Sequence, residues 1–334
     1  MPNALPRVAI ATGDPAGIGP EVGLKTALDS AVNAMCRPIV VGDPAVLSQH
    51  ARACGMADNF NVIADAKAAR WSDQINVLAA PMPEGTKLVF GTHGAAYGLG
   101  ALASARLAIK AALAGDVEAV VAAPQNETSV HAAGIEFDGY PSFVAKETGT
   151  DKNDVFLMLC FGERRIVHTT LHLSVAEAIK LVTRERVGRA IRSADAALKR
   201  LGIASPKLII SGLNPHAGEG GLFGREELDI IIPAIEDAKA AGFDVTGPFG
   251  ADTMFHKKCD AFIVMLHDQG HITAKLLAPN QTAGLAIGTP ILFSSVAHGS
   301  AFDIAGKNQA SPAAMVEAIR RLVGGRTTTA AAAE

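Results

Sequence analysis

The sequence has little of what marks secreted, membrane or nucleic-acid-binding proteins. Its 334 residues hold four cysteines and no CxxC pair, which favours reduced thiols over disulfides. The net charge is −3 and no run of Lys or Arg occurs, so we expect no nucleic acid partner. No apolar run reaches the roughly 20 residues of a membrane span, and no signal-peptide pattern opens the chain. These absences predict a cytoplasmic protein without nucleic acid or membrane partners.

A dinucleotide fingerprint of the form G-x-G-x-x-G is also missing, although a glycine-rich turn follows the first apolar run. This turn reads TGDPAGIGPEV over residues 12–22, and its glycines allow close approach of the backbone. Pro20 suits the first position of a following helix. Taken alone, the segment is equally well explained as a tight strand-to-helix turn.

The hydrophobic content of 49% is enough to bury a substantial core. Short β-branched runs alternate with segments of helical period, which is typical of an α/β fold with a mostly parallel central sheet. The expected strands are Val8–Thr12, Pro38–Val41, Ala119–Ala122, Val155–Leu159, Ile166–Thr169, Leu208–Ser211, Ala261–Leu266, Thr282–Ile287 and Ile291–Val296. The expected helices are Glu21–Ser30, Ala45–Cys54, Gly98–Ala114, Ser174–Leu181, Arg184–Leu201, Glu226–Ala241 and Pro312–Val323. No linker marks a domain boundary, so two domains would need a chain that crosses between them more than once.

Three of the ten histidines stand just past the ends of expected strands. They are His172 in TTLHLS, His216 in GLNPHAGEGG and His267 in MLHDQGH. In open α/β sheets, ligands bind beyond the carboxyl ends of the strands. Three neutral imidazoles with one open position are typical of a catalytic divalent-metal site, whose open position takes a substrate oxygen. Spacing alone does not show that the three converge, and a satisfied structural histidine is the alternative for each.

The turn at residues 12–22 can be compared with a second segment, AHGSAFDIAGK, at residues 297–307. The pair resembles the two signatures of the isocitrate/isopropylmalate dehydrogenase superfamily, which border its dinucleotide. This resemblance implies a two-domain α/β/α sandwich of that type. It also implies that the adenosine half of NAD lies near Ile18, His298, Gly299, Ala301, Asp303 and Ile304.

Four motifs, in this order, resemble the 4-hydroxythreonine-4-phosphate dehydrogenase family of vitamin B6 biosynthesis. They are GLNPHAGEGG, ADT at residues 251–253, HDQG and HGSAFDIAG, within a similarity that extends from residue 7 to about residue 323. The resemblance implies that His172 and His216 bind a divalent metal together with His267 of the partner subunit. It places Asp252 at an acidic active-site position, where a buried carboxylate would orient a ligand or take a proton. It also implies a cofactor contact for Asn214.

The same resemblance implies a homodimer with shared active sites and a divided chain. We expect residues 1–130 and 278–334 to form the nucleotide-side domain, and residues 131–277 to form the metal and dimerisation domain. Three histidines suit Zn, Fe, Co, Ni or Mn, and Mg is a further candidate cation, so the sequence does not select the metal.

Several positions depart from the family. Members that act on the phosphorylated substrate carry Lys in a TGPxxK-like turn where this chain has Glu127, and a His-Thr pair where it has Tyr140 and a proline. A phosphate-contacting Asn and Arg correspond to Gly284 and Phe293, and Lys275 remains of that cationic set. Replacing Lys by Glu and losing a bidentate Arg would weaken the binding of a phosphomonoester. Compensation by other residues is the alternative.

These departures resemble the terephthalate cis-dihydrodiol dehydrogenase-like members of the family, as do PQNETSVHAAGIEFDGYPS, RIVHTTLHLSV and HDQGHITAKLLAPN. The resemblance implies an NAD- and metal-dependent oxidation of 1,2-dihydroxy-3,5-cyclohexadiene-1,4-dicarboxylate, with decarboxylation to protocatechuate and CO2. Tyr140 and Phe293 suit a planar ring better than a phosphate, and Lys275 is a candidate partner for a substrate carboxylate.

Three alternatives stay open at this point. The first is 4-hydroxythreonine-4-phosphate dehydrogenase activity in pyridoxal phosphate biosynthesis. The second is a metal-binding sensor without turnover, which would need no dinucleotide loop. The third is a phosphate-binding transferase that uses the glycine-rich turn, which would leave HGSAFDIAG unexplained.

Overall fold

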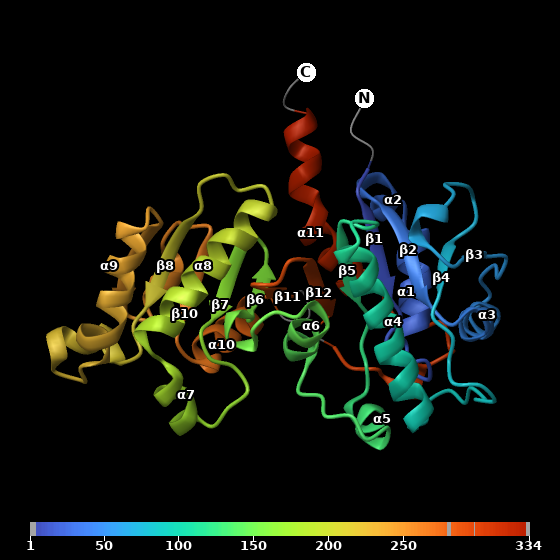
Figure 1. Cartoon of the computed structure of the whole chain (residues 1–334), viewed down its shortest axis with the longest axis horizontal. Coiled ribbons are helices and arrows are strands. Elements are labelled where there is room, and N and C mark those ends of the chain that lie inside the picture. Colours follow the sequence, from blue (N-terminus) through green and yellow to red (C-terminus); the bar gives the residue numbers. More distant parts are fainter. Residues whose placement is uncertain (1–4, 279–281, 297, 332–334) are drawn as a thin grey trace. The chain divides into compact units, whose positions relative to one another are not determined.

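The computed structural model describes residues 5–278, 282–296 and 298–331, and the chain forms two compact units (Figure 1). Unit 1 comprises Met1–Thr148 and Pro290–Glu334, and unit 2 comprises Gly149–Thr289. The boundaries expected from the sequence followed residues 130 and 277. The first of these would divide the helix α5 (Glu127–Ala132), which packs on α4 (Ala95–Leu113) and so belongs to unit 1.

The described part of unit 1 is built on parallel strands in the order β3-β4-β2-β1-β5-β12. Their bounds are β1 (Arg7–Ala11), β2 (Arg37–Gly42), β3 (Asn61–Ile63), β4 (Asn76–Ala79), β5 (Ala119–Ala122) and β12 (Leu292–Val296). In the register, Ile10 pairs with Val40 on one side and Val121 on the other, and all three are fully buried. Continuous apolar runs of this kind are expected where helices cover both faces of a parallel sheet.

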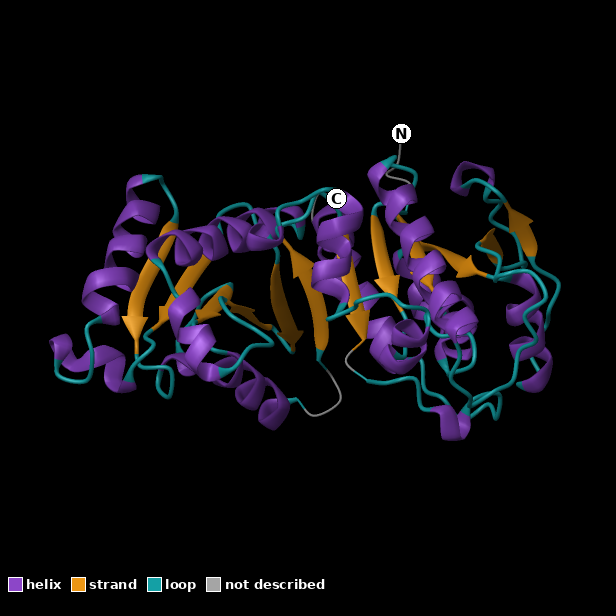
Figure 2. Ribbon diagram, turned by 60° about the horizontal axis from the view of Figure 1, so that its bottom comes forward, coloured by secondary structure: helices purple, strands orange, loops and turns teal. Residues whose placement is uncertain are grey.

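The helices of unit 1 flank these strands (Figure 2). They are α1 (Gly19–Leu28), α2 (Ser30–Met35), α3 (Pro44–Ala53), α4, α5, α6 (Tyr140–Thr148) and α11 (Ala313–Ala331). Helix α4 packs on β1, β2 and β5, whereas α11 packs on β5 and β12 and contacts α1 and α2. The side chains of Asp29 and Asp43 cap α2 and α3 by accepting backbone N–H groups of the first turn.

Unit 2 has the strand order β11-β6-β7-β10-β8-β9. The bounds are β6 (Phe156–Phe161), β7 (Arg164–His168), β8 (Lys207–Ser211), β9 (Asp244–Phe249), β10 (Ala261–Val264) and β11 (Ala283–Ile287). Strands β7, β10, β8 and β9 are parallel, and β6 is antiparallel to both β7 and β11. A two-residue turn joins β6 to β7, with Gly162 at φ 49°, and so short a connection permits only an antiparallel pair.

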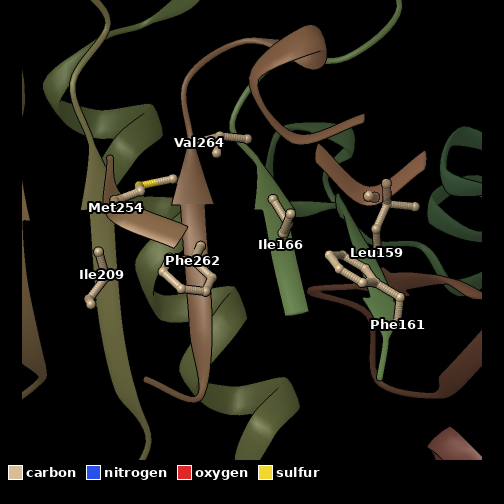
Figure 3. Packing of buried hydrophobic residues seen from close by; sticks show 8 residues of the cluster. Leu159, Phe161, Ile166, Ile209, Met254, Phe262 and Val264 are labelled. Carbon is tan, nitrogen blue, oxygen red and sulfur yellow. The ribbon is translucent and has the colours of Figure 1, made fainter. Parts of the chain in front are cut away.

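The α-helices that accompany the strands in the described part of unit 2 are α7 (Val175–Leu181), α8 (Arg184–Arg200), α9 (Ile232–Ala240) and α10 (His267–Leu277). A π-helical turn, Glu227–Ile231, leads into α9. The core cluster on this sheet is formed by Leu159, Phe161, Ile166, Ile209, Met254, Phe262, Val264 and Ala274 (Figure 3). Ile166 and Val264 are fully buried on β7 and β10, which places the carboxyl ends of these two strands on a rigid base.

The predicted α/β fold with a mostly parallel sheet is confirmed, and β6 is the antiparallel exception. The strands β3, β4 and β9 and the helices α2, α5, α6 and α10 were not expected. Ala297 of the expected cofactor loop lies outside the described residues, as do residues 279–281. Across the part of the chain that is described, no helix has the length and apolar character needed to cross a membrane.

Candidate active site

Two of the three predicted metal ligands lie side by side in unit 2. His172 follows β7 in the loop before α7, and His267 is the first residue of α10, just after β10. Their ring centroids are 5.8 Å apart. Both residues line a hollow of about 630 Å³ with other residues of segments 171–178 and 266–268. Because β7 and β10 are parallel neighbours, their carboxyl ends deliver both imidazoles to one edge of the sheet.

The carboxylate of Asp268 determines that Nδ1 of His267 carries a hydrogen. His267 Nδ1 lies 2.7 Å from Asp268 Oδ1. Because a carboxylate oxygen accepts, Nδ1 carries the hydrogen, and in the neutral ring Nε2 keeps its lone pair. Such a carboxylate holds a metal-binding histidine in the tautomer that coordinates. The contact therefore suits His267 to bind a metal through Nε2.

Two further histidines, His168 and His271, extend this cluster. His168 is the last residue of β7 and is 1% exposed, and His271 lies one turn after His267 on α10. The rings of His271 and His267 stack with centroids 3.8 Å apart and an interplanar angle of 10°. His271 Nδ1 lies 3.1 Å from His168 Nε2. Burial lowers the pKa of His168 to about 3 and is the main cause that lowers the pKa of His271 to about 4, so both are neutral near pH 7.

His216 lies on backbone of unusual conformation. In the turn Pro215–Gly221 after β8, φ is positive at His216 (51°), Ala217 (53°) and Glu219 (44°). Each non-glycine residue in this region costs roughly 1–2 kcal/mol, so local contacts must hold the turn. Strain of this kind clusters at functional sites. The side chain of His216 is 63% exposed, which leaves it accessible to a ligand.

The buried carboxylate of Glu227 holds this turn in place. Glu227 is 2% exposed. Its Oε1 accepts the backbone N–H groups of Leu213 (2.7 Å) and Asn214 (2.8 Å), and its Oε2 accepts from Asn214 Nδ2 (2.9 Å). A Cβ on Gly218 would lie 2.6 Å from Glu227 Oε2, so only glycine fits there. Asn214, the predicted cofactor contact, thus has its amide nitrogen engaged within unit 2.

We expect Glu227→Gln to destabilise unit 2 by roughly 2–4 kcal/mol, because two backbone donors lose a charged acceptor and the new amide faces Asn214 Nδ2. Glu226→Gln is the matched control, since Glu226 accepts from the Asn214 side chain at 2.7 Å and is less buried. Thermal unfolding measures the difference. Equal melting temperatures for the two variants would show that Glu227 does not hold the turn.

The donor types suit a divalent metal, but one chain does not gather all three. Within residues 5–278, 282–296 and 298–331, no three His, Cys, Asp or Glu side chains are grouped as ligands. His172 and His267 form a close pair, whereas the backbone of His216 lies against Gly250, where an added Cβ would be 3.6 Å from His216 Cα. A nitrogen from a second chain would complete a three-histidine set.

The two other predicted active-site residues of unit 2 are both exposed. Asp252 follows β9 in an open loop, and Lys275 lies on α10 one turn after His271. A buried carboxylate was expected at Asp252, whereas its side chain is exposed in the single chain. Asp252 Oδ1 would lie 2.8 Å from a Cβ on Gly250, which keeps the carboxylate close to the His216 turn.

In unit 1, the two predicted nucleotide segments contact each other. Ile18 N donates to Ser300 O at 2.9 Å. A Cβ on Gly17 would lie 2.8 Å from Ser300 Cβ, so glycine allows the turn after β1 to approach the loop after β12. Ala301 has φ 39° and turns this loop into the short 3-10 segment Phe302–Ile304, which carries Asp303. The structure thus brings Ile18 together with the loop that includes His298 and Gly299.

A third segment, which the sequence analysis missed, joins these two. Gly91 N donates to Ala16 O at 2.8 Å, and the His93 ring lies 4.6 Å from the Phe302 ring. His93 Nδ1 lies 3.0 Å from Asn126 Oδ1, which links the segment to the cap of α5. The His93 position in FGTHG carries no periodic signal, so only the fold reveals this contact.

Tyr140 is enclosed rather than open. It is 8% exposed, and its hydroxyl donates to Ala123 O at 3.1 Å. Its ring lies 5.1 Å from that of Phe293, which is 1% exposed on β12. Burial raises the pKa of the Tyr140 phenol well above its usual value, so the group is neutral. In this structure the predicted aromatic pair supports the backbone turn after β5 instead of presenting a free hydroxyl.

The negative charge of Glu127 lies in the first turn of a helix, where it is favourable. Glu127 is the exposed first residue of α5, whose cap Asn126 accepts from Ser129 N at 2.9 Å. A carboxylate in the first turn interacts favourably with the helix dipole. Gly284 lies elsewhere, buried on β11 opposite Leu159.

Comparison with known proteins gives a consistent assignment. The chain matches the family described as pyridoxal phosphate biosynthetic protein PdxA over residues 34–322. It is 41% identical over 323 residues to a 1,2-dihydroxy-3,5-cyclohexadiene-1,4-dicarboxylate dehydrogenase from Comamonas sp, with 95% of this chain and 96% of the relative covered. It is 38% identical over 326 residues to a D-threonate 4-phosphate dehydrogenase from Cupriavidus necator, with 96% and 97% covered.

A solved structure supports the same grouping. The crystal structure of a 4-hydroxythreonine-4-phosphate dehydrogenase from Burkholderia phymatum matches with a TM-score of 0.86 and 35% identity. The match covers 97% of this chain and 99% of that chain. All three relatives carry the name of a dehydrogenase.

Proposed function

This chain belongs to the pyridoxal phosphate biosynthetic protein PdxA family, and we propose that it is a metal-dependent NAD dehydrogenase of a cyclic dihydrodiol dicarboxylate. The chain is an enzyme, because its full-length relatives are dehydrogenases. Its proposed substrate is 1,2-dihydroxy-3,5-cyclohexadiene-1,4-dicarboxylate, and its proposed products are protocatechuate and CO2. The competing substrates are 4-hydroxythreonine-4-phosphate and D-threonate 4-phosphate, which both carry a phosphate.

One observation carries the choice of substrate: Glu127 and Phe293 stand where the family has a phosphate-binding Lys and Arg, and Lys275 alone remains of that cationic set. Glu127 places an exposed carboxylate at the start of α5, and Phe293 places a buried ring beside Tyr140. The Glu127 carboxylate repels a phosphate dianion, and the Phe293 ring offers it no hydrogen-bond donor. The 41% identity to the dihydrodiol dicarboxylate dehydrogenase points to the same substrate.

The residues of unit 2 supply the proposed chemistry. We assign His172, His216 and His267 to a divalent metal, which when bound would polarise the carbonyl formed by oxidation and favour loss of CO2. Asp252 and Lys275 are the candidates to take the hydroxyl proton while NAD accepts the hydride. Both side chains are exposed and therefore accessible to a substrate.

The surface around the histidine pair supports a homodimer with shared sites. Leu173 and Val175 line the hollow beside His172 and are 46% and 63% exposed. On α10, Ile272 and Leu276 are 56% and 77% exposed. Clustered exposed apolar side chains mark protein interfaces. We propose that a second copy of the chain covers this surface and supplies the missing metal ligand.

We expect NAD to be preferred over NADP by roughly tenfold or more in kcat/KM, because the Asp303 carboxylate would repel the 2′-phosphate of NADP. Asp303→Asn should lower the ratio of kcat/KM with NAD to kcat/KM with NADP, without changing kcat with NAD. Asp73→Asn, which alters an exposed carboxylate before β4, is the control and should leave the ratio unchanged. Equal or better efficiency with NADP in the native protein would contradict this role of Asp303.

Turnover on a substrate panel tests the proposed function. The native protein is incubated with NAD, each of Zn²⁺, Co²⁺, Mn²⁺ and Mg²⁺, and the dihydrodiol dicarboxylate or either phosphate ester. NADH absorbance follows oxidation, and chromatography with CO2 trapping identifies the products. Oxidation of the dihydrodiol without CO2 release would remove decarboxylation from the proposal, and a lack of NAD reduction on any hydroxy acid would favour a sensor.

A further inference from the structure

We propose that His271 and His168 are positioning residues for His267, in which His168 selects the tautomer of His271 and His271 holds the plane of the His267 ring. The inference deepens the proposed function, because it rests on His267 as a metal ligand. Neither residue is placed in contact with metal or substrate.

The ring of His267 is held on two sides. Helix α10 places His271 four residues after His267, so the two rings share one helix face, where they stack at 3.8 Å and 10°. Asp268 Oδ1 accepts from His267 Nδ1 at 2.7 Å. The stack restricts tilting of the ring and the hydrogen bond restricts rotation within its plane, so the direction of Nε2 is set before any ligand arrives.

A chain of hydrogen bonds determines where the proton of His271 lies. His168 Nδ1 lies 3.4 Å from Leu157 O, and a carbonyl can only accept, so this nitrogen carries the hydrogen. Among the described residues, the hydrogen-bond partners of His168 are a carbonyl and a second imidazole, neither of which bears negative charge, and a buried unpaired imidazolium would be costly. In neutral His168, Nε2 is then an acceptor for His271 Nδ1–H at 3.1 Å. His271 is therefore fixed as the Nδ1–H tautomer.

The packing around His168 fixes the position of its imidazole next to His271. His168 pairs in register with Leu157 on β6 and Val264 on β10, so its position is set by the sheet. A Cβ on Gly270 would lie 2.3 Å from His168 Nε2, so glycine at this position leaves room for the imidazole under α10. The sheet and the helix thus both accommodate the His168–His271 contact.

The expected consequence concerns metal affinity. Contacts that orient a metal-binding histidine typically change affinity by about 10–100-fold when removed. His271→Leu removes both the stack partner and the link to His168, so the Kd for Co²⁺ should rise by about that factor. His168→Leu should weaken binding too, whereas His168→Gln keeps an acceptor oxygen for His271 and should restore it.

The experiment has two readouts on the full-length protein. Co²⁺ titration, followed by visible absorbance, gives Kd and coordination geometry for the native chain, the three variants above, His267→Ala and His256→Leu, an exposed histidine used as control. In the metal-free, ¹⁵N-histidine-labelled protein, NMR gives the tautomer of each ring. We expect His271 as the Nδ1–H form in the native protein and in His168→Gln, and a mixed form in His168→Leu.

The outcomes separate this inference from the function on which it rests. Native affinity for Co²⁺ in His271→Leu, or an Nε2–H form of His271 in the native chain, would overturn the positioning role while the metal site stood. Loss of Co²⁺ binding in His267→Ala with a 10-fold or larger loss in His271→Leu would support both. Unchanged Co²⁺ binding in His267→Ala would overturn the metal site and the inference together.

Discussion

Replacing His172, His216 or His267 by Ala should lower turnover by roughly a thousandfold or more, because each change removes one of three neutral nitrogen ligands from the proposed metal site. Bound metal should fall in parallel, measured by elemental analysis after dialysis against trace metal. The ring centroids of His172 and His267 lie 5.8 Å apart in one chain, so replacing either residue removes one nitrogen donor of this close pair.

The control for this prediction must be an exposed histidine. His50 is unsuitable, because it is fully buried and its Nε2 bonds to Pro15 O at 2.8 Å, so its loss would destabilise unit 1. His256→Ala, at an exposed position of unit 2, should keep native metal content and turnover. Full activity in His216→Ala would remove that residue from the site and leave the strain of its turn without this explanation.

Mixing inactive variants tests which chain provides which ligand. If His267 comes from the partner subunit, a heterodimer of His172→Ala and His267→Ala has one intact site, and full subunit exchange should restore about a quarter of native activity. The pair His172→Ala with His216→Ala should restore none. The close contact of His172 and His267 within one chain offers the converse arrangement, with His216 from the partner subunit. In that arrangement, the first pair of variants would restore no activity, and the pair His172→Ala with His216→Ala would restore about a quarter.

Much of the fold followed from the sequence, because buried strands and amphipathic helices have distinct periods. The apolar run Ala119–Ala122 forms β5 without any shift of its ends. The short strand β3 was missed because Asn61–Ile63 is partly exposed and edge strands carry little hydrophobic pattern. Helix α10 was not expected because its first residues, HDQG, are polar and include glycine.

The candidate site was only partly predictable for a related reason. The His267 position was visible because a buried strand leads into it, but His168 lies within the expected strand Ile166–Thr169 and has the pattern of an ordinary core residue. The spacing of four residues between His267 and His271 was present in HDQGH, and it becomes a signal only once the segment is known to be helical. Glu227 could not be found, because nothing in a sequence distinguishes a carboxylate that accepts buried backbone N–H groups from an exposed one.

The phosphate esters should be poor substrates, with kcat/KM lower than that of the dihydrodiol dicarboxylate by roughly a thousandfold, since the loss of a bidentate Arg and an attractive Lys removes several kcal/mol of binding. Glu127 contributes repulsion at an exposed helix start, where a single change can be tested without disturbing the core. Glu127→Lys should raise kcat/KM for 4-hydroxythreonine-4-phosphate or D-threonate 4-phosphate by roughly tenfold, because one repulsive charge becomes attractive.

The matched control for this change is Glu163→Lys, in the exposed turn between β6 and β7, which alters net charge equally at a different place. It should leave the ratio of the two substrates unchanged, which separates a local effect from long-range attraction of anions. Phe293 is not a useful site for restoring the Arg, because it is 1% exposed and packs on Tyr140, so a guanidinium there would lack room and solvent. Efficient native oxidation of either phosphate ester, with no turnover of the dihydrodiol, would show that other residues replace the lost cations and that phosphate recognition survived the substitutions.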